Sequence, residues 1–366
     1  MDQSLEAPRK HSRVSIIDVA RLANVSVTTA SRVLSGSSHP VSNLYRARVL
    51  EAARTLNYSP SALAKAMVTG DTYIVGVIIG DATDPYFAAI IRGVEDVARA
   101  NGYLVIVCNS DRVPEIELQY LNTLNDYRVD GIIFAGGGLT DKDYLKDVEQ
   151  VLGIFRDRNA ACVSLGKHLF PSVPVLVDNV QVVIDAMDYL IGLGHTGIAY
   201  ISGPGLLTTA ELRLRGYKTA LDRHGKSLNP DFILSGDYKY ESGLRAARRI
   251  HEMSAKPTAV LATNDLMAIG CLVGLKALGY RIPEEISLVG IDDIPFAQFV
   301  DPSLTTIYLP LYDLGKIGME TLIRLRTGEM KTNDPITLQH RLVVRKSTEP
   351  PKGRNSPGKD FAEGNR

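Results

Sequence analysis

Residues 14–34 read VSIIDVARLANVSVTTASRVL, and this stretch decides how the N-terminal part of the chain folds. Ser15 and Asp18 have the spacing of a capping box, in which a hydroxyl group at the helix N-cap is followed by a carboxylate three residues later. The spacing predicts a short helix over residues 16–22. Asn24, a residue type that tolerates a left-handed backbone, is expected to end it.

Two more helices follow from the same kind of signal. Ser26 is expected to cap a second helix that runs to Leu34, and a third helix fits residues 43–56. The apolar side chains expected to face inward are Val19 and Leu22, then Ala30, Val33 and Leu34, then Val49, Ala53 and Leu56. Two short helices around a tight turn, braced by a third, predict a helix-turn-helix domain whose second helix enters the DNA major groove. Periodicity alone leaves a small three-helix module for protein contacts equally open.

Charge is unevenly distributed along the chain. The 366 residues carry 41 basic and 41 acidic side chains, and this neutral total argues at first against a nucleic-acid partner. Residues 1–70, however, hold nine basic and four acidic side chains, so this part carries +5 and the remaining 296 residues carry −5. A basic head suits contact with phosphate, although solvated basic surfaces are also common.

From residue 73 onward, short apolar runs alternate with amphipathic stretches. The apolar runs include residues 74–79, 104–108, 131–135, 197–201, 259–262 and 287–291. The amphipathic stretches include residues 86–100, 115–127, 180–193, 211–224 and 265–278. Continuously apolar strands suit a parallel sheet covered on both faces. The alternation predicts a doubly wound α/β architecture, and its length allows two lobes.

Several protein classes are disfavoured by what the sequence lacks. No run approaches the ~20 apolar residues of a membrane-spanning helix, and the first 13 residues do not resemble a secretory signal. Three widely spaced cysteines argue against a disulfide framework or a zinc cluster and favour a cytoplasmic protein. The seven histidines lack metal-ligand spacing, and we find neither a phosphate-binding loop nor a catalytic arrangement. We therefore expect no catalytic residue, no metal and no cofactor.

Residues 14–34, with Val41-Ser42 and the LNYSP run at residues 56–60, closely resemble the DNA-binding head of the lactose-repressor (LacI/GalR) family of bacterial transcription regulators. The similarity extends from about Val14 to Arg345. It includes Asp84-Pro85-Tyr86-Phe87, Thr263-Asn264-Asp265, Gly290-Ile291-Asp292-Asp293 and residues 301–307 (DPSLTTI). The resemblance implies an α/β fold: a helix-turn-helix head joined to a two-lobed effector domain like a periplasmic sugar-binding protein.

The resemblance also implies domain boundaries. Three crossings between the lobes are expected near Val177, Ile307 and Thr337. The expected parts are a flexible N-terminus (1–13), the helix-turn-helix domain (14–60), a hinge helix and linker (61–72), the effector-binding and dimerisation domain (73–346), and a disordered tail (347–366). Within the effector domain, the N-lobe takes residues 73–177 and 308–337, and the C-lobe takes residues 178–307 and 338–346.

Roles at the DNA follow from the family positions. Val27 and Thr28 stand where the family's variable base-reading pair lies. Arg32 matches an arginine that reaches a base edge, and its guanidinium group is able to bond guanine O6 and N7 together. Three hydroxyl side chains are expected to contact phosphates and so position the helix: Ser26, Thr29 and Ser31.

Residues 60–67 match the family's hinge helix, which enters the minor groove together with its copy from a second subunit. Ala64 and Lys65 lie in this segment, and Met67 stands where the family has a leucine that wedges open the central base step. Methionine is long, apolar and flexible, so it is still suited to insertion. The alternative is an ordinary linker helix with Met67 packed on the core.

Seven residues match family positions around the cleft between the lobes. Arg213, Asn264 and Asp292 correspond to positions that hydrogen-bond effector hydroxyls, and a polyhydroxyl ligand needs such a mixture of donors and acceptors. Three aromatic side chains are expected to cover the C–H face of a sugar: Tyr86, Phe87 and Tyr238. Asp84 is expected to add a hydrogen-bond acceptor beside them. For Arg213 and Asp292 the alternative is an ion pair without ligand contact, and for Phe87 it is core packing.

The resemblance predicts a homodimeric repressor that binds a near-palindromic operator under the control of a small effector. Leu207 occupies a position where the purine repressor has an effector-contacting arginine, which favours a sugar or sugar derivative over a purine. Three alternatives stay open: the same DNA-binding regulator controlled by a protein partner, a transport-type solute-binding protein, and a nucleotide-using enzyme.

Overall fold

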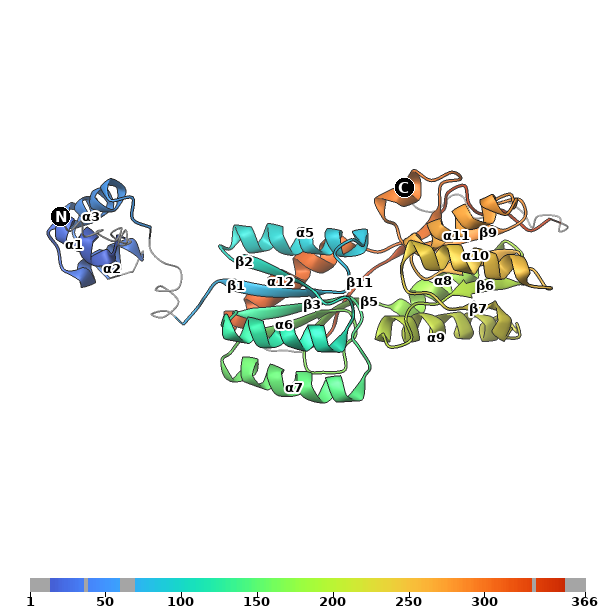
Figure 1. Cartoon of the computed structure of the whole chain (residues 1–366), viewed down its shortest axis with the longest axis horizontal. Coiled ribbons are helices and arrows are strands. Elements are labelled where there is room, and N and C mark those ends of the chain that lie inside the picture. Colours follow the sequence, from blue (N-terminus) through green and yellow to red (C-terminus); the bar gives the residue numbers. More distant parts are fainter. Residues whose placement is uncertain (1–13, 36–38, 60–69, 331–333, 353–366) are drawn as a thin grey trace, which may run out of the picture. The chain divides into compact units, whose positions relative to one another are not determined.

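The computed structural model describes residues 14–35, 39–59, 70–330 and 334–352. These residues fall into two compact units that divide between residues 72 and 73. Figure 1 labels the helices and strands of both units. The first unit is helical, and the second contains two mainly parallel sheets with helices on their faces.

The N-terminal unit contains helices α1 (Ile16–Ala23), α2 (Val27–Leu34) and α3 (Asn43–Thr55). The predicted capping box begins α1: the Ser15 hydroxyl accepts from the backbone N–H of Asp18, and the Asp18 carboxylate accepts from the backbone N–H of Ser15 at 2.9 Å. Asn24 follows with φ 53°, the left-handed conformation expected of it. The three helices enclose a small core of valines and alanines: Val19, Ala20, Ala23, Ala30, Val33, Val49, Ala52 and Ala53.

The prediction that Leu22 faces inward is wrong, because its side chain is 53% exposed. The buried face of α1 is formed by Val19, Ala20 and Ala23. With 100° of rotation per residue, this face is centred between Val19 and Ala20, and Leu22 projects roughly 110° away from it. Small alanines on the inner face let α1 approach its neighbours closely.

The first sheet of the second unit has the strand order β11-β5-β4-β3-β1-β2, and all its pairings are parallel. Helices α5 and α12 pack together against it, and α6 and α7 form a second pair (Figure 1). We call this sheet and its helices the N-lobe. Its strands are β1 (Ile74–Ile79), β2 (Leu104–Asn109), β3 (Gly131–Ala135), β4 (Ala161–Leu165), β5 (Val173–Val177) and β11 (Ile336–Leu338). Its helices are α5 (Pro85–Ala100), α6 (Pro114–Asp126), α7 (Lys142–Asp157) and α12 (Leu311–Arg326).

The second sheet, in the C-lobe, has the order β12-β10-β9-β8-β6-β7, with only β12 antiparallel among these paired strands. Its strands are β6 (Ile198–Ile201), β7 (Ile233–Leu234), β8 (Ala259–Ala262), β9 (Ser287–Asp292), β10 (Thr305–Tyr308) and β12 (Arg341–Val343). Its helices, which pack as the pairs α8 with α9 and α10 with α11, are α8 (Asn179–Gly192), α9 (Thr208–Arg223), α10 (Tyr240–Glu252) and α11 (Asp265–Ala277). Two 3₁₀ turns, η1 (Pro230–Phe232) and η2 (Pro295–Gln298), complete the described part of this lobe.

The chain passes between the two sheets at three places. It leaves the N-lobe after β5, returns to it between β10 and α12, and crosses once more between β11 and β12. Both lobes therefore present the carboxyl ends of their parallel strands to the same interlobe region, which is where ligand sites form in such sheets. In the described part of the chain, no helix is both long and apolar enough to cross a membrane.

The expected disordered tail from residue 347 is wrong for residues 347–352. The Ser347 hydroxyl is fully buried, donates to the Leu288 carbonyl at 2.6 Å and accepts from the Thr305 backbone N–H at 2.8 Å. Glu349 continues the pairing, because its carbonyl accepts from the Ser287 hydroxyl at 3.0 Å. A polar sequence here does not mean exposure, since these polar groups bond the C-lobe strands. Residues 353–366 lie outside the described residues.

Candidate functional site

All seven predicted cleft residues line one cavity between the lobes. The cavity and its open mouth together contain about 650 Å³ of empty space. Asp84, Tyr86 and Phe87 come from the N-lobe, at the start of α5. The C-lobe supplies a residue of α9 and three residues at or near strand and helix ends: Arg213, Tyr238, Asn264 and Asp292.

Arg213 is almost completely buried, and its guanidinium group is held in place by several polar contacts. Its Nε donates to Asn179 Oδ1 at 2.8 Å, its Nη1 donates to the Thr263 carbonyl, and its Nη2 lies 3.7 Å from Asp292 Oδ1. The guanidinium group is therefore a fixed donor in the cleft.

Asp292 offers an acceptor beside that donor. Its Oδ1 is buried and has no hydrogen-bond partner, since the 3.7 Å separation from Arg213 is too long for a hydrogen bond. Asp292 also has φ 121°, an unusual backbone conformation for a residue with a side chain. Burial raises the pKa of Asp292 strongly, against the opposing charge of Arg213. An unsatisfied acceptor in a cavity is suited to a hydroxyl group from outside the chain.

The remaining C-lobe residues divide between ligand contact and support. Tyr238 has a buried hydroxyl group without a hydrogen-bond partner. Asn264 instead uses its side chain internally: Oδ1 caps α11 by accepting from the Met267 N–H at 3.0 Å, and Nδ2 donates to the Tyr238 carbonyl at 2.9 Å. Asn264 therefore supports the loop that contains Tyr238. Its Oδ1 keeps one lone pair that is able to accept a hydrogen bond from a ligand.

On the N-lobe side, Asp84 caps α5 and faces the cavity. Its Oδ1 accepts from the Tyr86 N–H at 3.0 Å, and its Oδ2 lies 4.0 Å from Arg112 Nη2. Burial raises the pKa of Asp84. Tyr86 and Phe87 contact each other edge to face, with ring centroids 5.0 Å apart. Phe87 packs in the hydrophobic core and also lines the cavity.

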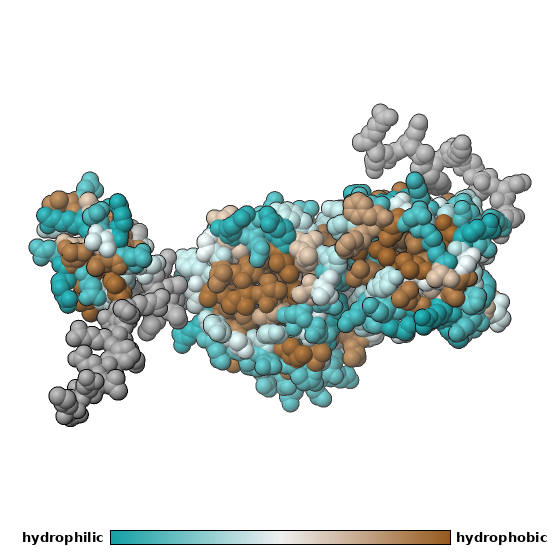
Figure 2. Space-filling model, turned by 45° about the horizontal axis from the view of Figure 1, so that its top comes forward, coloured by the Kyte–Doolittle hydropathy of each residue, from teal (hydrophilic) through white to brown (hydrophobic). Residues whose placement is uncertain are grey.

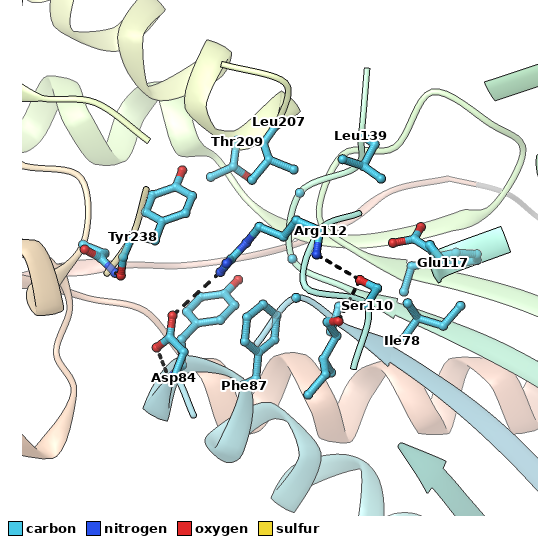
Figure 3. A pocket seen from close by; sticks show the side chains of 18 of the residues that line it. Ile78, Asp84, Phe87, Ser110, Arg112, Glu117, Leu139, Leu207, Thr209 and Tyr238 are labelled. Carbon is cyan, nitrogen blue, oxygen red and sulfur yellow. Dashed lines mark hydrogen bonds and ion pairs between the residues drawn. The ribbon is translucent and has the colours of Figure 1, made fainter. Parts of the chain in front are cut away.

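The cavity extends beyond the predicted set into the N-lobe (Figure 3). In this part, the buried Glu117 carboxylate accepts a hydrogen bond from the Tyr144 hydroxyl, and burial raises the pKa of Glu117. His168 contacts the Phe134 ring, and burial lowers the pKa of His168 to about 4, so it is neutral at pH 7. The lining residues absent from the sequence prediction include Ser110, Arg112, Glu117, Phe134, Leu139, His168 and Thr209. Ser110 and Arg112 closely follow β2, and this position at the carboxyl end of a strand is the main feature of the sequence that would have indicated them.

Backbone hydrogen bonds join the two lobes along one side of the cavity. The Thr208 N–H donates to the Gly138 carbonyl at 2.9 Å, and the Thr140 N–H donates to the Leu206 carbonyl at 3.0 Å. Between these bonds, Leu139 and Leu207 form an antiparallel bridge. Leu207 is therefore both a lobe contact and an apolar part of the lining.

In the N-terminal unit, α2 presents the expected outer face. Val27, Thr28 and Arg32 are exposed, whereas Ala30 and Val33 of the same helix are buried. The cap of the helix is Ser26, whose Oγ accepts from the Thr29 N–H at 3.1 Å and lies 2.8 Å from Thr29 Oγ1. Ser31 is half-buried. The predicted minor-groove residues Ala64, Lys65 and Met67 lie outside the described residues.

Comparison with known proteins identifies the family. Residues 15–61 match the model of bacterial regulatory proteins of the lacI family, and residues 187–348 match a periplasmic binding protein-like domain. Catabolite control protein A of Priestia megaterium is 34% identical, over 92% of this chain and 99% of its own length. The chain belongs to the LacI family of bacterial regulatory proteins. The predicted family and fold are thereby confirmed.

Other LacI-family proteins resemble the whole chain or its effector domain. The repressor CytR of Escherichia coli K12 is 31% identical over 94% of this chain and 99% of its own. Among solved structures, the lac repressor dimer bound to operator and an anti-inducer has 27% identity and a TM-score of 0.82, covering 92% of this chain and 100% of that one. A LacI-family regulator from Enterococcus faecium with bound ribose has 27% identity and a TM-score of 0.67, covering 76% and 100%.

Proposed function

We propose that this LacI-family protein is a homodimeric repressor that binds a near-palindromic operator. Its affinity for the operator changes when a sugar or sugar derivative binds in the interlobe cavity. The observation that carries the effector proposal is the pairing of Arg213, a fixed donor, with the unpartnered Asp292 Oδ1. Aromatic rings of Tyr86 and Phe87 line the same cavity. Neighbouring donors and acceptors beside aromatic rings match the hydroxyl groups and C–H faces of a sugar.

The DNA part of the proposal rests on α2. Val27, Thr28 and Arg32 lie on an exposed face and are the base-reading residues of the proposal, with Ser26, Thr29 and Ser31 placed at phosphates. The sequence of residues 60–67 extends the proposal to the minor groove, with Ala64 and Lys65 at the DNA and Met67 as the inserted side chain. The protein would act in the cytoplasm, on operator DNA in the nucleoid.

A second copy of the chain fits the edge of the N-lobe sheet. Strand β2 is the last strand at that edge, and it exposes Leu104 and Val107. Figure 2 shows an apolar area on the N-lobe surface. An exposed apolar sheet edge promotes aggregation of a monomer, and burial in a dimer would cover it. Leu272 and Leu275, apolar residues of α11, belong to the C-lobe core and are not available for this contact.

Effector control follows from the position of the cavity. A ligand bound between the lobes changes their relative angle, and in a dimer this changes the spacing of the two segments that lead to the DNA-binding heads. By thermodynamic linkage, an effector that weakens operator binding must itself bind the DNA-bound dimer less tightly.

A thermal-shift screen tests the effector site. Wild type, Asp292→Ala and the control Asp222→Ala, which alters an exposed aspartate of the same lobe, are each screened with D-ribose, D-glucose, D-galactose and cellobiose. A sugar that stabilises wild type and Asp222→Ala should stabilise Asp292→Ala much less. Equal stabilisation of all three proteins would show that the sugar does not bind at Asp292.

Selection of bound genomic fragments at fixed salt tests the DNA function. Specific binding should enrich one near-palindromic sequence, and Met67→Ala should weaken binding to it far more than binding to random DNA. Enrichment of no palindrome would contradict the operator proposal, and equal losses on both DNAs would contradict the role of Met67.

A further inference from the structure

Arg112 is held across the cavity by an unusual loop. Asp111 and Arg112 follow β2 with φ angles of 52° and 60°, a left-handed conformation that residues with side chains seldom adopt twice in succession. The Arg112 backbone N–H donates to Ser110 Oγ at 3.3 Å, which helps to fix this loop. Strain of this kind persists where the surroundings enforce it, and it often marks a functional position. Here it directs the arginine side chain into the space between the lobes (Figure 3).

The guanidinium group of Arg112 contacts both lobes. Its central carbon lies 5.7 Å from the centre of the Phe87 ring in the N-lobe and 5.5 Å from the centre of the Tyr238 ring in the C-lobe. Its Nη2 is 4.0 Å from Asp84 Oδ2. Gly80 leaves room for the chain of the arginine, because a Cβ atom at that position would lie 2.9 Å from Arg112 Nε. The side chain is thus seated between two aromatic rings and a carboxylate.

Two cavities adjoin at this seat. The inner cavity contains Arg213 and Asp292, whereas an adjoining outer cavity is lined by Asp81, Lys239 and other polar residues. Among the described residues, Asp84, Arg112 and Tyr238 alone line both cavities, so these three residues lie where the cavities meet. Elsewhere along the cavity, the bridge between Leu139 and Leu207 ties the lobes together by backbone hydrogen bonds.

We propose that Arg112 is a gate: its guanidinium group closes the inner cavity against the outer one and swings away when a ligand enters or leaves. The inference rests on the proposed function, because it takes the inner cavity as the effector site. Arg112 suits this task better than Asp84. The Asp84 carboxylate is fixed as the cap of α5, whereas the guanidinium group of Arg112 makes only ring contacts and a long ion pair with the described residues. Because Arg112 lies where the two cavities adjoin, a ligand that spans both of them requires its side chain to be displaced.

Access to the inner cavity is measurable without knowing the effector. Thr209 lines the inner cavity and not the outer one, so Thr209→Cys places a thiol behind the gate. The rate of its alkylation by iodoacetamide is measured in full-length protein, alone and combined with Arg112→Ala or Arg112→Lys. Protein with only the native Cys108, Cys162 and Cys271 supplies the background rate. Arg99→Ala, which removes an exposed arginine of the same lobe, is the matched control.

Loss of the two ring contacts and the ion pair should speed alkylation in the Arg112→Ala protein by about five- to thirtyfold, with Arg112→Lys intermediate and Arg99→Ala unchanged. Removing a cation would if anything raise the pKa of a nearby thiol and slow its alkylation, so a faster rate reports access. Equal rates in wild type and both Arg112 variants, all with native circular dichroism, would overturn the gate. Because this assay uses neither sugar nor DNA, its failure is distinct from failure of the proposed function.

Discussion

Asp265 gives the sharpest prediction for the stability of the C-lobe. This carboxylate is fully buried at the start of α11, where Oδ1 accepts from the Thr306 hydroxyl at 2.6 Å and Oδ2 accepts from the Ile294 backbone N–H at 2.9 Å. Burial raises the pKa of Asp265 to about 7, and these hydrogen bonds offset only part of the rise. The residue also supports the cavity, because Ile294 lies two residues after Asp292.

The magnitude follows from the pKa. Raising it from 3.8 in the unfolded chain to about 7 in the folded chain corresponds to about 4 kcal/mol. Because the folded protein binds the proton more tightly, this contribution to stability is complete below pH 3.8 and is lost as the pH rises through 7. Asp265→Asn keeps the shape and an acceptor for the Ile294 N–H but does not titrate. The difference in unfolding free energy, variant minus wild type, should therefore grow by about 4 kcal/mol from pH 4 to pH 8.

Urea unfolding followed by circular dichroism measures this difference at several pH values, since the chain has no tryptophan to serve as a fluorescent probe. Burial also raises the pKa values of Asp84, Glu117 and Asp292 and lowers those of His168 and His195, so wild-type stability alone would mix the contributions of several groups. Subtracting the wild-type curve from the Asp265→Asn curve isolates Asp265 and its effect on Asp292. A difference that stays constant between pH 4 and pH 8 would refute the reasoning, because it would mean that Asp265 has the same pKa in the folded and unfolded chains.

Three further substitutions test other parts of the chain. Ser15→Ala removes the capping box of α1 and should destabilise the head by about 1 kcal/mol, which thermal unfolding of the full chain should show in its helical head transition. Arg32→Ala should weaken binding to the selected operator by about 1–3 kcal/mol and change binding to random DNA much less, as measured by fluorescence anisotropy at one salt concentration; equal losses would limit Arg32 to phosphate contact. Ser347→Ala leaves the Thr305 N–H without its acceptor and should cost about 1–3 kcal/mol in urea unfolding, whereas a neutral effect would show that water replaces the hydroxyl group.

Much of the fold was predictable because its signals are local and repeated. Strands β1, β3 and β8 have the predicted bounds, since a short and continuously apolar run leaves few alternatives. The start of α9 was harder: it begins at Thr208, three residues before the predicted amphipathic stretch, and the N-cap residue Leu207 makes no side-chain hydrogen bond that a sequence pattern would reveal. The bridge between Leu139 and Leu207 joins segments far apart in the chain, which local periodicity does not address.

The residues of the site also divide into those that the sequence indicated and those that only the fold revealed. The seven predicted cavity residues were found by family position, and six of them lie at or near the ends of strands or the start of a helix, where α/β sheets collect ligand groups. Arg112 was missed because its role depends on two consecutive left-handed residues, and although Asp111 is a residue type that tolerates this conformation, Arg112 is not. Glu117 was missed for a different reason: a carboxylate on an amphipathic helix normally predicts a solvated position, and only the fold places it against Tyr144.

The neutral total charge of the chain conceals a functional asymmetry. The +5 of residues 1–70 belongs to the DNA-binding part, and the −5 of the remainder belongs to the part with the cavity. In a dimer, two basic heads would face the phosphates while two acidic bodies would be repelled by them. The affinity for operator should then fall steeply with salt, because counterions are released at the heads. Effector affinity should change little with salt, because Arg213 and Asp292 lie buried, within a few ångströms of each other, where mobile ions do not screen them. The neutral total of this chain is therefore the sum of two parts whose opposite charges favour contact with DNA through the head alone.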